Sequence, residues 1–227
     1  MHILLLVCEL CVLYILSRVV TQRLFVLFLQ IFRVRSVAIT CMLLLQFPGT
    51  VIHELAHLFT AEILGVRTGK LRLEPESIRE DDINAGSVMI AQTDPLRRYL
   101  IGLAPLFWGV SALAILAYFL STSGDMGKWG YVGMAYLIFA VSNTMFPSPA
   151  DTKGITPFLL TIVVFCAAGY VLGIRFQLSG VALETVIRII ETLTKSLGLV
   201  VGMNIILLLF TAVILGLYAR AFKITTI

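Results

Sequence analysis

Long apolar runs separated by short polar stretches limit what this sequence can fold into. The hydrocarbon core of a bilayer is about 30 Å thick and is crossed by about 20 apolar residues in a helix. Hydrophobic residues make up 59% of the 227 residues and charged residues only 13%, whereas about a quarter of a soluble domain is charged. The apolar runs cover residues 3–17, 24–32, 37–66, 99–120, 130–146, 155–174 and 199–219. We therefore expect an all-α polytopic membrane protein with about six transmembrane helices, because a helix satisfies its own backbone in lipid.

Two hydrated stretches interrupt these runs. Residues 67–98 hold six of the 13 acidic residues and include GSVMIAQT (86–93), whose strand-forming residues lie between a glycine and Asp-Pro. This pattern predicts a small strand-containing insertion. Residues 175–198 carry apolar residues at helical spacing among charges, which predicts an amphipathic helix on the membrane surface or against the bundle.

Charge is low and does not decide the orientation of the chain. The net charge of +4 is distributed along the loops, which suits contact with the lipid bilayer and gives no sign of nucleic-acid binding. The arginines between residues 18 and 35 favour a cytoplasmic position for that segment. The loop at 67–98 is also rich in bases, so either 24–35 lies at the interface or 37–66 does not cross fully. We expect a multi-pass integral membrane protein, in the cell membrane if the source is prokaryotic.

The segment GTVIHELAHLFTAEILG (49–65) places an HExxH motif inside an apolar run. Residues four apart share one face of a helix, so His53 and His57 present their imidazoles together, at a spacing that suits tetrahedral zinc. Glu54 projects beside that face and can take a proton from a zinc-bound water, whose pKa zinc lowers to about 7. Each ionisable side chain in a spanning helix costs on the order of 2.5–3.5 kcal/mol. Three of them together need a compensating partner, either a metal or an interhelical hydrogen-bond cluster.

The third zinc ligand is expected in SNTMFPSPADTKG (142–154). Its two prolines prevent regular helix, and such backbone is tolerated at membrane depth only inside protein or beside a watery cavity. Asp151 is the only acid of this segment and is the predicted ligand; the alternative is a loop aspartate paired with Lys153. The only other histidine, His2, is at the N-terminus, and Glu62 lies on the opposite face of the HExxH helix.

Together these motifs resemble the site-2 protease family of intramembrane zinc metalloproteases. The second motif of that family reads N-x-x-P-x-P-x-x-D-G. Here Asn143 to Asp151 keeps the eight-residue step, while both prolines fall one place later and Thr152-Lys153-Gly154 replaces the glycine after the aspartate. LIGLAPLFWG (100–109) is similar to the stretch that opens the next core helix of the family, although Ala104 precedes Pro105 where the family usually has glycine. The resemblance covers about residues 37–160.

The resemblance implies zinc-dependent hydrolysis of peptide bonds in or near transmembrane segments of membrane-protein or peptide substrates. It implies His53, His57 and Asp151 as zinc ligands and Glu54 as the general base. Asn143 would hold substrate or stabilise the oxyanion, unless it serves as a helix cap or an interhelical amide contact. The strand residues Gly86, Ser87, Val88, Met89 and Ile90 would offer an edge to an extended substrate, unless they form a structural hairpin.

These expectations divide the chain into three parts. Residues 1–36 form an N-terminal transmembrane helix and a basic interfacial segment, 37–160 the metalloprotease core, and 161–227 the C-terminal helices. Within the core, Pro48 should kink or restart the helix, and the HExxH helix is expected to begin near Thr50 and to end near Gly65. The rival functions are a non-proteolytic membrane metal-binding or assembly protein that retains the site, and an ion transporter. The sequence does not predict the oligomeric state.

Overall fold

The computed structural model describes residues 2–72, 78–79, 82–83, 87–90, 93–122, 124–152, 155–173 and 180–222. Its helices are α1 (His2–Phe32), α2 (Arg35–Ile63), α3 (Pro95–Thr122), α4 (Gly127–Thr144), α5 (Ile155–Val171) and α6 (Val181–Phe222). Its strands are β1 (Thr68–Arg72), β2 (Ile78–Arg79), β3 (Asp82–Ile83) and β4 (Ser87–Ile90). Among the described helices, α1, α2, α3 and α6 are long and apolar enough to cross a membrane. The chain is therefore largely helical, and its helices are compatible with membrane insertion.

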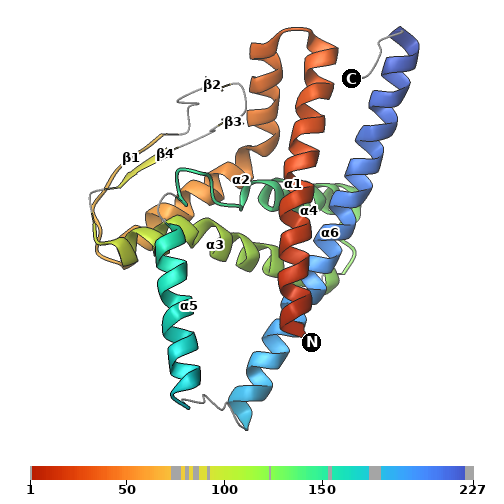
Figure 1. The fold of residues 1–227 in the computed structure, drawn as a ribbon. Helices are drawn as coiled ribbons and strands as arrows, with labels where there is room; N and C mark the ends of the chain where they lie inside the picture. Colours follow the sequence, from red (N-terminus) through yellow and green to blue (C-terminus); the bar gives the residue numbers. More distant parts are fainter. Residues whose placement is uncertain are drawn as a thin grey trace.

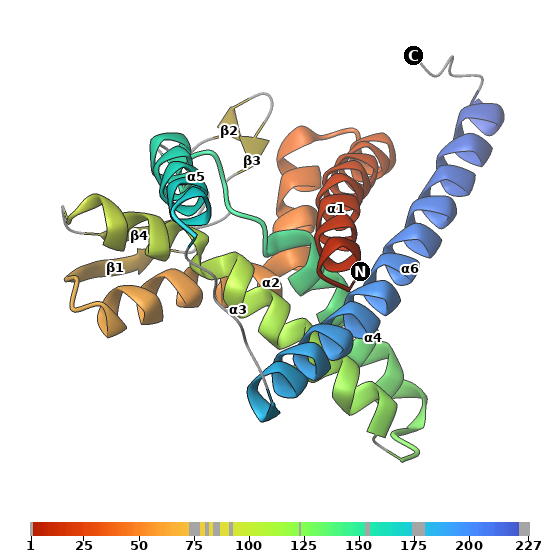
Figure 2. The ribbon, with the colours of Figure 1, turned by 60° about the horizontal axis from the view of Figure 1, so that its bottom comes forward.

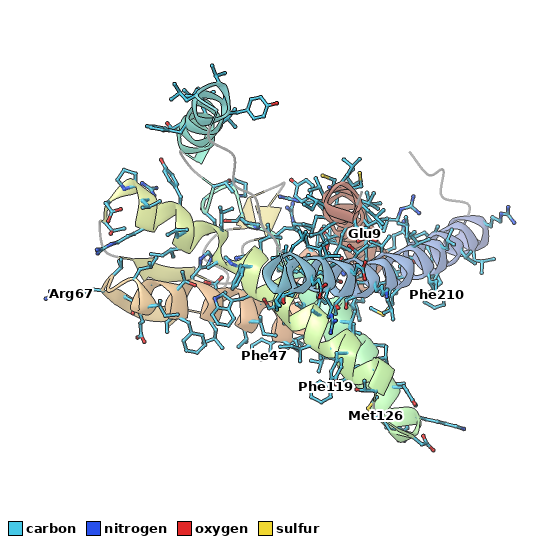
Figure 3. All side chains as sticks on the ribbon, turned by 90° about the horizontal axis from the view of Figure 1, so that it is seen from below. Glu9, Phe47, Arg67, Phe119, Met126 and Phe210 are labelled. Carbon is cyan, nitrogen blue, oxygen red and sulfur yellow. The ribbon has the colours of Figure 1, made fainter. Side chains whose placement is uncertain are left out.

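Five of the helices pack around a shared core, and α5 stands apart. Helix α1 lies beside the first part of α2 and beside α6, while α3 and α4 run across behind α1 in the view of Figure 1. One buried cluster joins Leu13 of α1, Leu113 of α3, Ile138 of α4 and Leu197 of α6. Helix α5 projects away from the others and contacts α3 (Figure 3). The core thus holds α1, α3, α4 and α6 together, and Ile52 of α2 packs against it.

Helices α1 and α6 are longer than the hydropathy pattern predicts. Residues 3–17 and 24–32 belong to the single helix α1, because the arginines between them are good helix formers and do not interrupt it. The predicted helix at 175–198 is present from Val181 onward, and it continues into the last apolar run as one helix of 42 residues. Residues 175–179 lie outside the described part of the chain. The helix changes from charged to apolar near residue 198. This change marks different surroundings of the helix and does not end it.

Helix α2 passes through Pro48 instead of starting after it. The predicted start near Thr50 is wrong, since the helix begins at Arg35. Figure 1 shows that α2 bends strongly between its two parts. Pro48 has no N–H to donate to the Leu44 carbonyl one turn earlier, which explains a kink without an end. The Tyr136 hydroxyl of α4 donates to that carbonyl over 3.4 Å.

The end of α2 lies where the sequence predicts it. The helix ends at Ile63, and Gly65 has a φ of +68°, which a glycine adopts without strain. The Gly65 N–H bonds the Glu62 carbonyl over 3.0 Å, and the Val66 N–H bonds the Ala61 carbonyl over 2.8 Å. These two bonds form a Schellman cap, which stops the helix and turns the chain into β1.

The polar loop after α2 contains two antiparallel strand pairs. Strand β1 pairs with β4, with Leu71 opposite Val88, and β2 pairs with β3. Strand β4 lies within the predicted strand at 86–93, although Gly86 and residues 91–92 are outside the described residues. Both β1 and β4 contact α2, and they lie on the opposite side of the molecule from α6 (Figure 2). The insertion is therefore anchored to the helix that carries the HExxH motif.

Candidate metal centre

The three side chains expected to bind zinc lie together between α2 and the turn after α4. His57 Nε2 is 3.3 Å from Asp151 Oδ1, and His53 Nε2 is 3.6 Å from Asp151 Oδ2. The ligand atoms of the three residues all lie within 4.8 Å of one another. Ligands of a tetrahedral zinc ion with bonds of about 2.0–2.1 Å are separated by about 3.3 Å, so the spacing fits one ion. Within the described residues, this His–His–Asp group is the one that could hold a metal.

Asp151 is held by hydrogen bonds within its own turn. The Ser148 N–H donates to Asp151 Oδ2 over 2.7 Å, and the Asp151 N–H donates to Ser148 Oγ over 3.3 Å. This reciprocal pair is a capping box, with Pro149 at the favoured first position after the cap. These two hydrogen bonds hold the carboxylate in one orientation, as a metal ligand must be held.

His57 is oriented by a carbonyl that a proline exposes. His57 Nδ1 lies 2.9 Å from the Ile101 carbonyl oxygen in α3. Pro105 follows four residues later and has no N–H, so this carbonyl has no helical donor and is available to the imidazole. At the neighbouring Gly102, an added Cβ would overlap the Asp151 carbonyl, so α3 packs directly on the Asp151 turn. The proline and the glycine of α3 together place His57 and Asp151 next to each other.

His53 is oriented by a carbonyl at the end of a helix. His53 Nδ1 lies 2.7 Å from the Thr144 carbonyl oxygen in the last turn of α4, where carbonyls lack helical donors. Gly49 permits this approach, because an added Cβ would overlap the Ala140 carbonyl and Thr144 Oγ1. The close contact between α2 and α4 is therefore part of the site.

With both imidazoles neutral, these contacts fix the tautomers, and the remaining ligand atoms suit a cation. A carbonyl only accepts hydrogen bonds, so in both histidines Nδ1 carries the proton and donates. The lone pairs of both Nε2 atoms then face the carboxylate of Asp151, and all of these groups are acceptors. Acceptors at such distances repel one another unless a positive charge lies among them. The donor set therefore fits a metal ion.

Glu54 lies beside this group, and Glu62 does not. The side chain of Glu54 is 5% exposed and is close enough to His53, His57 and Asp151 for their charges to act on it. Glu62 is exposed and belongs to the other face of α2, as the helical spacing predicts. Lys153, the alternative partner of Asp151, lies outside the described residues.

Asn143 takes part in an interhelical network that the sequence left as an alternative. Its Nδ2 donates to the Phe139 carbonyl over 2.8 Å and to Asn204 Oδ1 of α6 over 3.0 Å. Its Oδ1 is buried and has no hydrogen-bond partner among the described residues. Asn204 was missed because the family resemblance ends before α6. The available signal was a lone asparagine within the apolar run 199–219.

Comparisons with known proteins assign no family to this chain. No family model matches it, and no curated protein or solved structure matches it either. The resemblance to site-2 proteases therefore depends on the sequence motifs alone.

Proposed function

We propose that this protein is an intramembrane zinc metalloprotease that hydrolyses peptide bonds in or near the transmembrane segments of membrane-protein substrates. The observation that supports it most is the convergence of His53, His57 and Asp151, with Glu54 beside them, inside an apolar bundle. Two imidazoles and a carboxylate that leave one position open are a typical ligand set of catalytic zinc. In this proposal α4 and α5 also cross the membrane, which gives about six spans.

The roles of the side chains follow from their positions. His53, His57 and Asp151 would hold the zinc ion, which would supply a Lewis acid for the scissile carbonyl and for a water molecule. Glu54 would take a proton from the attacking water and deliver it to the departing amine. The backbone contacts of His53 and His57 keep the rings from turning during the reaction. The buried position of the site restricts it to substrates that enter from the bilayer.

Asn143 is better placed to accept a hydrogen bond from substrate than to donate one. Both hydrogens of Nδ2 are used by Phe139 and Asn204, whereas Oδ1 lacks a partner in the described part of the chain. We therefore assign Asn143 to a backbone N–H of the extended substrate, and not to the oxyanion. A buried acceptor gains free energy when such a donor arrives.

The segment Gly86–Ile90 is proposed to hold the substrate by strand addition. A helix hides its peptide bonds in its own hydrogen bonds, so a substrate must be extended before cleavage. Strand β4 is paired with β1 on one edge and has no strand partner on the other among the described residues, so we assign that other edge to the substrate. Its contact with α2 keeps it close to the helix that carries the HExxH motif.

Metal analysis combined with a cleavage assay tests the proposal. Zinc content and cleavage of a membrane-embedded reporter helix are measured for the purified wild type, Glu54→Gln and Asp151→Ala. We expect zinc and cleavage in the wild type, zinc without cleavage in Glu54→Gln, and neither in Asp151→Ala. Equal zinc in all three proteins would overturn the site. Zinc in the wild type with function unchanged in Glu54→Gln would show a metal-binding protein that is not a protease.

A further inference from the structure

Helix α6 carries a buried asparagine with no role in the proposed reaction. Asn204 is 1% exposed and lies in a run of apolar residues, where an unsatisfied amide is costly. Its Nδ2 donates to Ser142 Oγ over 3.1 Å and to the Val200 carbonyl over 3.1 Å. Its Oδ1 accepts from Asn143 Nδ2 over 3.0 Å. Two of these three bonds cross to α4, so Asn204 connects the two helices.

Those bonds reach the last turn of α4, next to the metal centre. Ser142 is fully buried, and its hydroxyl also donates to the Phe139 carbonyl over 3.1 Å. The residue after Asn143 is Thr144, whose carbonyl accepts from His53 Nδ1 over 2.7 Å. The position of this carbonyl depends on how the last turn of α4 is held, because no further helical turn follows to fix it.

We propose that Asn204 is a positioning residue for His53. By holding Ser142 and Asn143, it keeps the Thr144 carbonyl in line with His53 Nδ1 and so keeps Nε2 directed at Asp151. The inference depends on the metal site of the proposed function and adds a residue from outside the two motifs. It concerns one histidine only, because the carbonyl partner of His57 belongs to α3.

A positioning role predicts a defined loss of metal affinity. Outer-shell partners of metal-binding histidines contribute about 10–100-fold to affinity. We therefore expect Asn204→Leu to weaken Co²⁺ binding by about that factor and to change the visible absorption bands of bound Co²⁺, which report ligand geometry. Ser142→Ala removes one of the same bonds with a smaller change in volume. It should shift affinity and spectrum in the same direction, by less.

Thr211→Val is the matched control. Thr211 is on the same helix and is also 1% exposed, but its hydroxyl bonds the Leu207 and Leu208 carbonyls of its own helix. We expect its Co²⁺ affinity and spectrum to equal those of the wild type. All measurements use the full-length protein in detergent, with thermal stability recorded in parallel.

The outcomes separate this inference from the proposed function. Altered Co²⁺ spectra in Asn204→Leu and Ser142→Ala, with an unchanged spectrum in Thr211→Val, support it. Lower thermal stability with wild-type spectrum and affinity overturns it, because Asn204 then only holds the helices together. If Asn204→Leu does not fold, Ser142→Ala decides between these two outcomes. A wild type that binds neither Co²⁺ nor Zn²⁺ overturns the metal site itself and the inference with it.

Discussion

The two histidines have the same chemical support from two different kinds of structure. His53 donates to the Thr144 carbonyl at the end of α4, and His57 donates to the Ile101 carbonyl in the second turn of α3. The first carbonyl is available because α4 ends there, and the second because Pro105 removes its helical donor. In lipid nearly every helical carbonyl is already bonded. Helix ends and prolines are the places where one is left for a side chain, and this site uses one of each.

Removing the carboxylate that both histidines share should have the largest effect. Loss of a residue that supports a metal ligand lowers affinity by about 10–100-fold. We expect Asp151→Ala to lower Zn²⁺ affinity by more than this, because it removes a direct ligand. Competition with a chromogenic chelator measures this. Asp151→Asn, which retains an oxygen for the Ser148 N–H, separates loss of charge from loss of the turn. Wild-type affinity in Asp151→Ala would show that the two histidines do not share this ligand.

Restoring the missing N–H at position 105 of α3 should weaken the support of His57 and leave that of His53 unchanged. In Pro105→Ala the new N–H competes with His57 Nδ1 for the Ile101 carbonyl, so we expect Zn²⁺ affinity to fall by about 10–100-fold. Thermal stability should not fall with the affinity, because the substitution removes a proline, which costs about 3 kcal/mol inside a helix.

Pro48→Ala provides the control for that change. The carbonyl freed by Pro48 belongs to Leu44 and faces Tyr136, away from the metal ligands. Zn²⁺ affinity should therefore be unchanged. Equal affinities for Pro105→Ala and the wild type would contradict the role assigned to the Ile101 carbonyl.

Separating α2 from α4 should weaken the hydrogen bond that orients His53. A Cβ at Gly49 would overlap the Ala140 carbonyl, and backbone atoms yield little. We expect Gly49→Ala to destabilise the protein by about 1–3 kcal/mol, as overpacking does, and to loosen the His53–Thr144 contact. Gly133→Ala, where an added Cβ meets no atom within 4 Å, should be neutral or slightly stabilising. Thermal unfolding in detergent compares the two, and equal stability would refute the close contact.

The smallest effect is expected at the Leu44 carbonyl, which Pro48 leaves without a helical donor. Tyr136→Phe removes the 3.4 Å hydrogen bond to the Leu44 carbonyl. The loss should be at most about 1 kcal/mol of folding stability, with Zn²⁺ affinity unchanged. A large loss of Zn²⁺ would mean that the bend in α2 itself controls the site.

The ligands of this site were predictable from the sequence, and their supports were not. His53 and His57 follow from helical spacing, and Asp151 follows because it is the only acid in a segment that cannot be helical. Their partners Thr144 and Ile101 act through backbone carbonyls, which every residue has and no residue type reveals. The one readable sign was a proline four residues after Ile101.

Helix limits were predicted well where local chemistry sets them and poorly where polarity was used instead. Gly65 ends α2 as expected, because its positive φ is a local property. The amphipathic stretch and the apolar run 199–219 form one helix, because charged residues change the surroundings of a helix without ending it. Pro48 produced a bend instead of an end, because the packing of α4 on both sides of the kink outweighs one lost hydrogen bond.

The capping box around Asp151 has a consequence for ion exchange. Immobilising a side chain costs about 0.5–1.5 kcal/mol of entropy, which a freely rotating carboxylate would lose each time an ion binds. The Ser148 turn imposes that loss during folding, before any ion arrives. A cation held at this site would then leave and return without a change in the Asp151 rotamer.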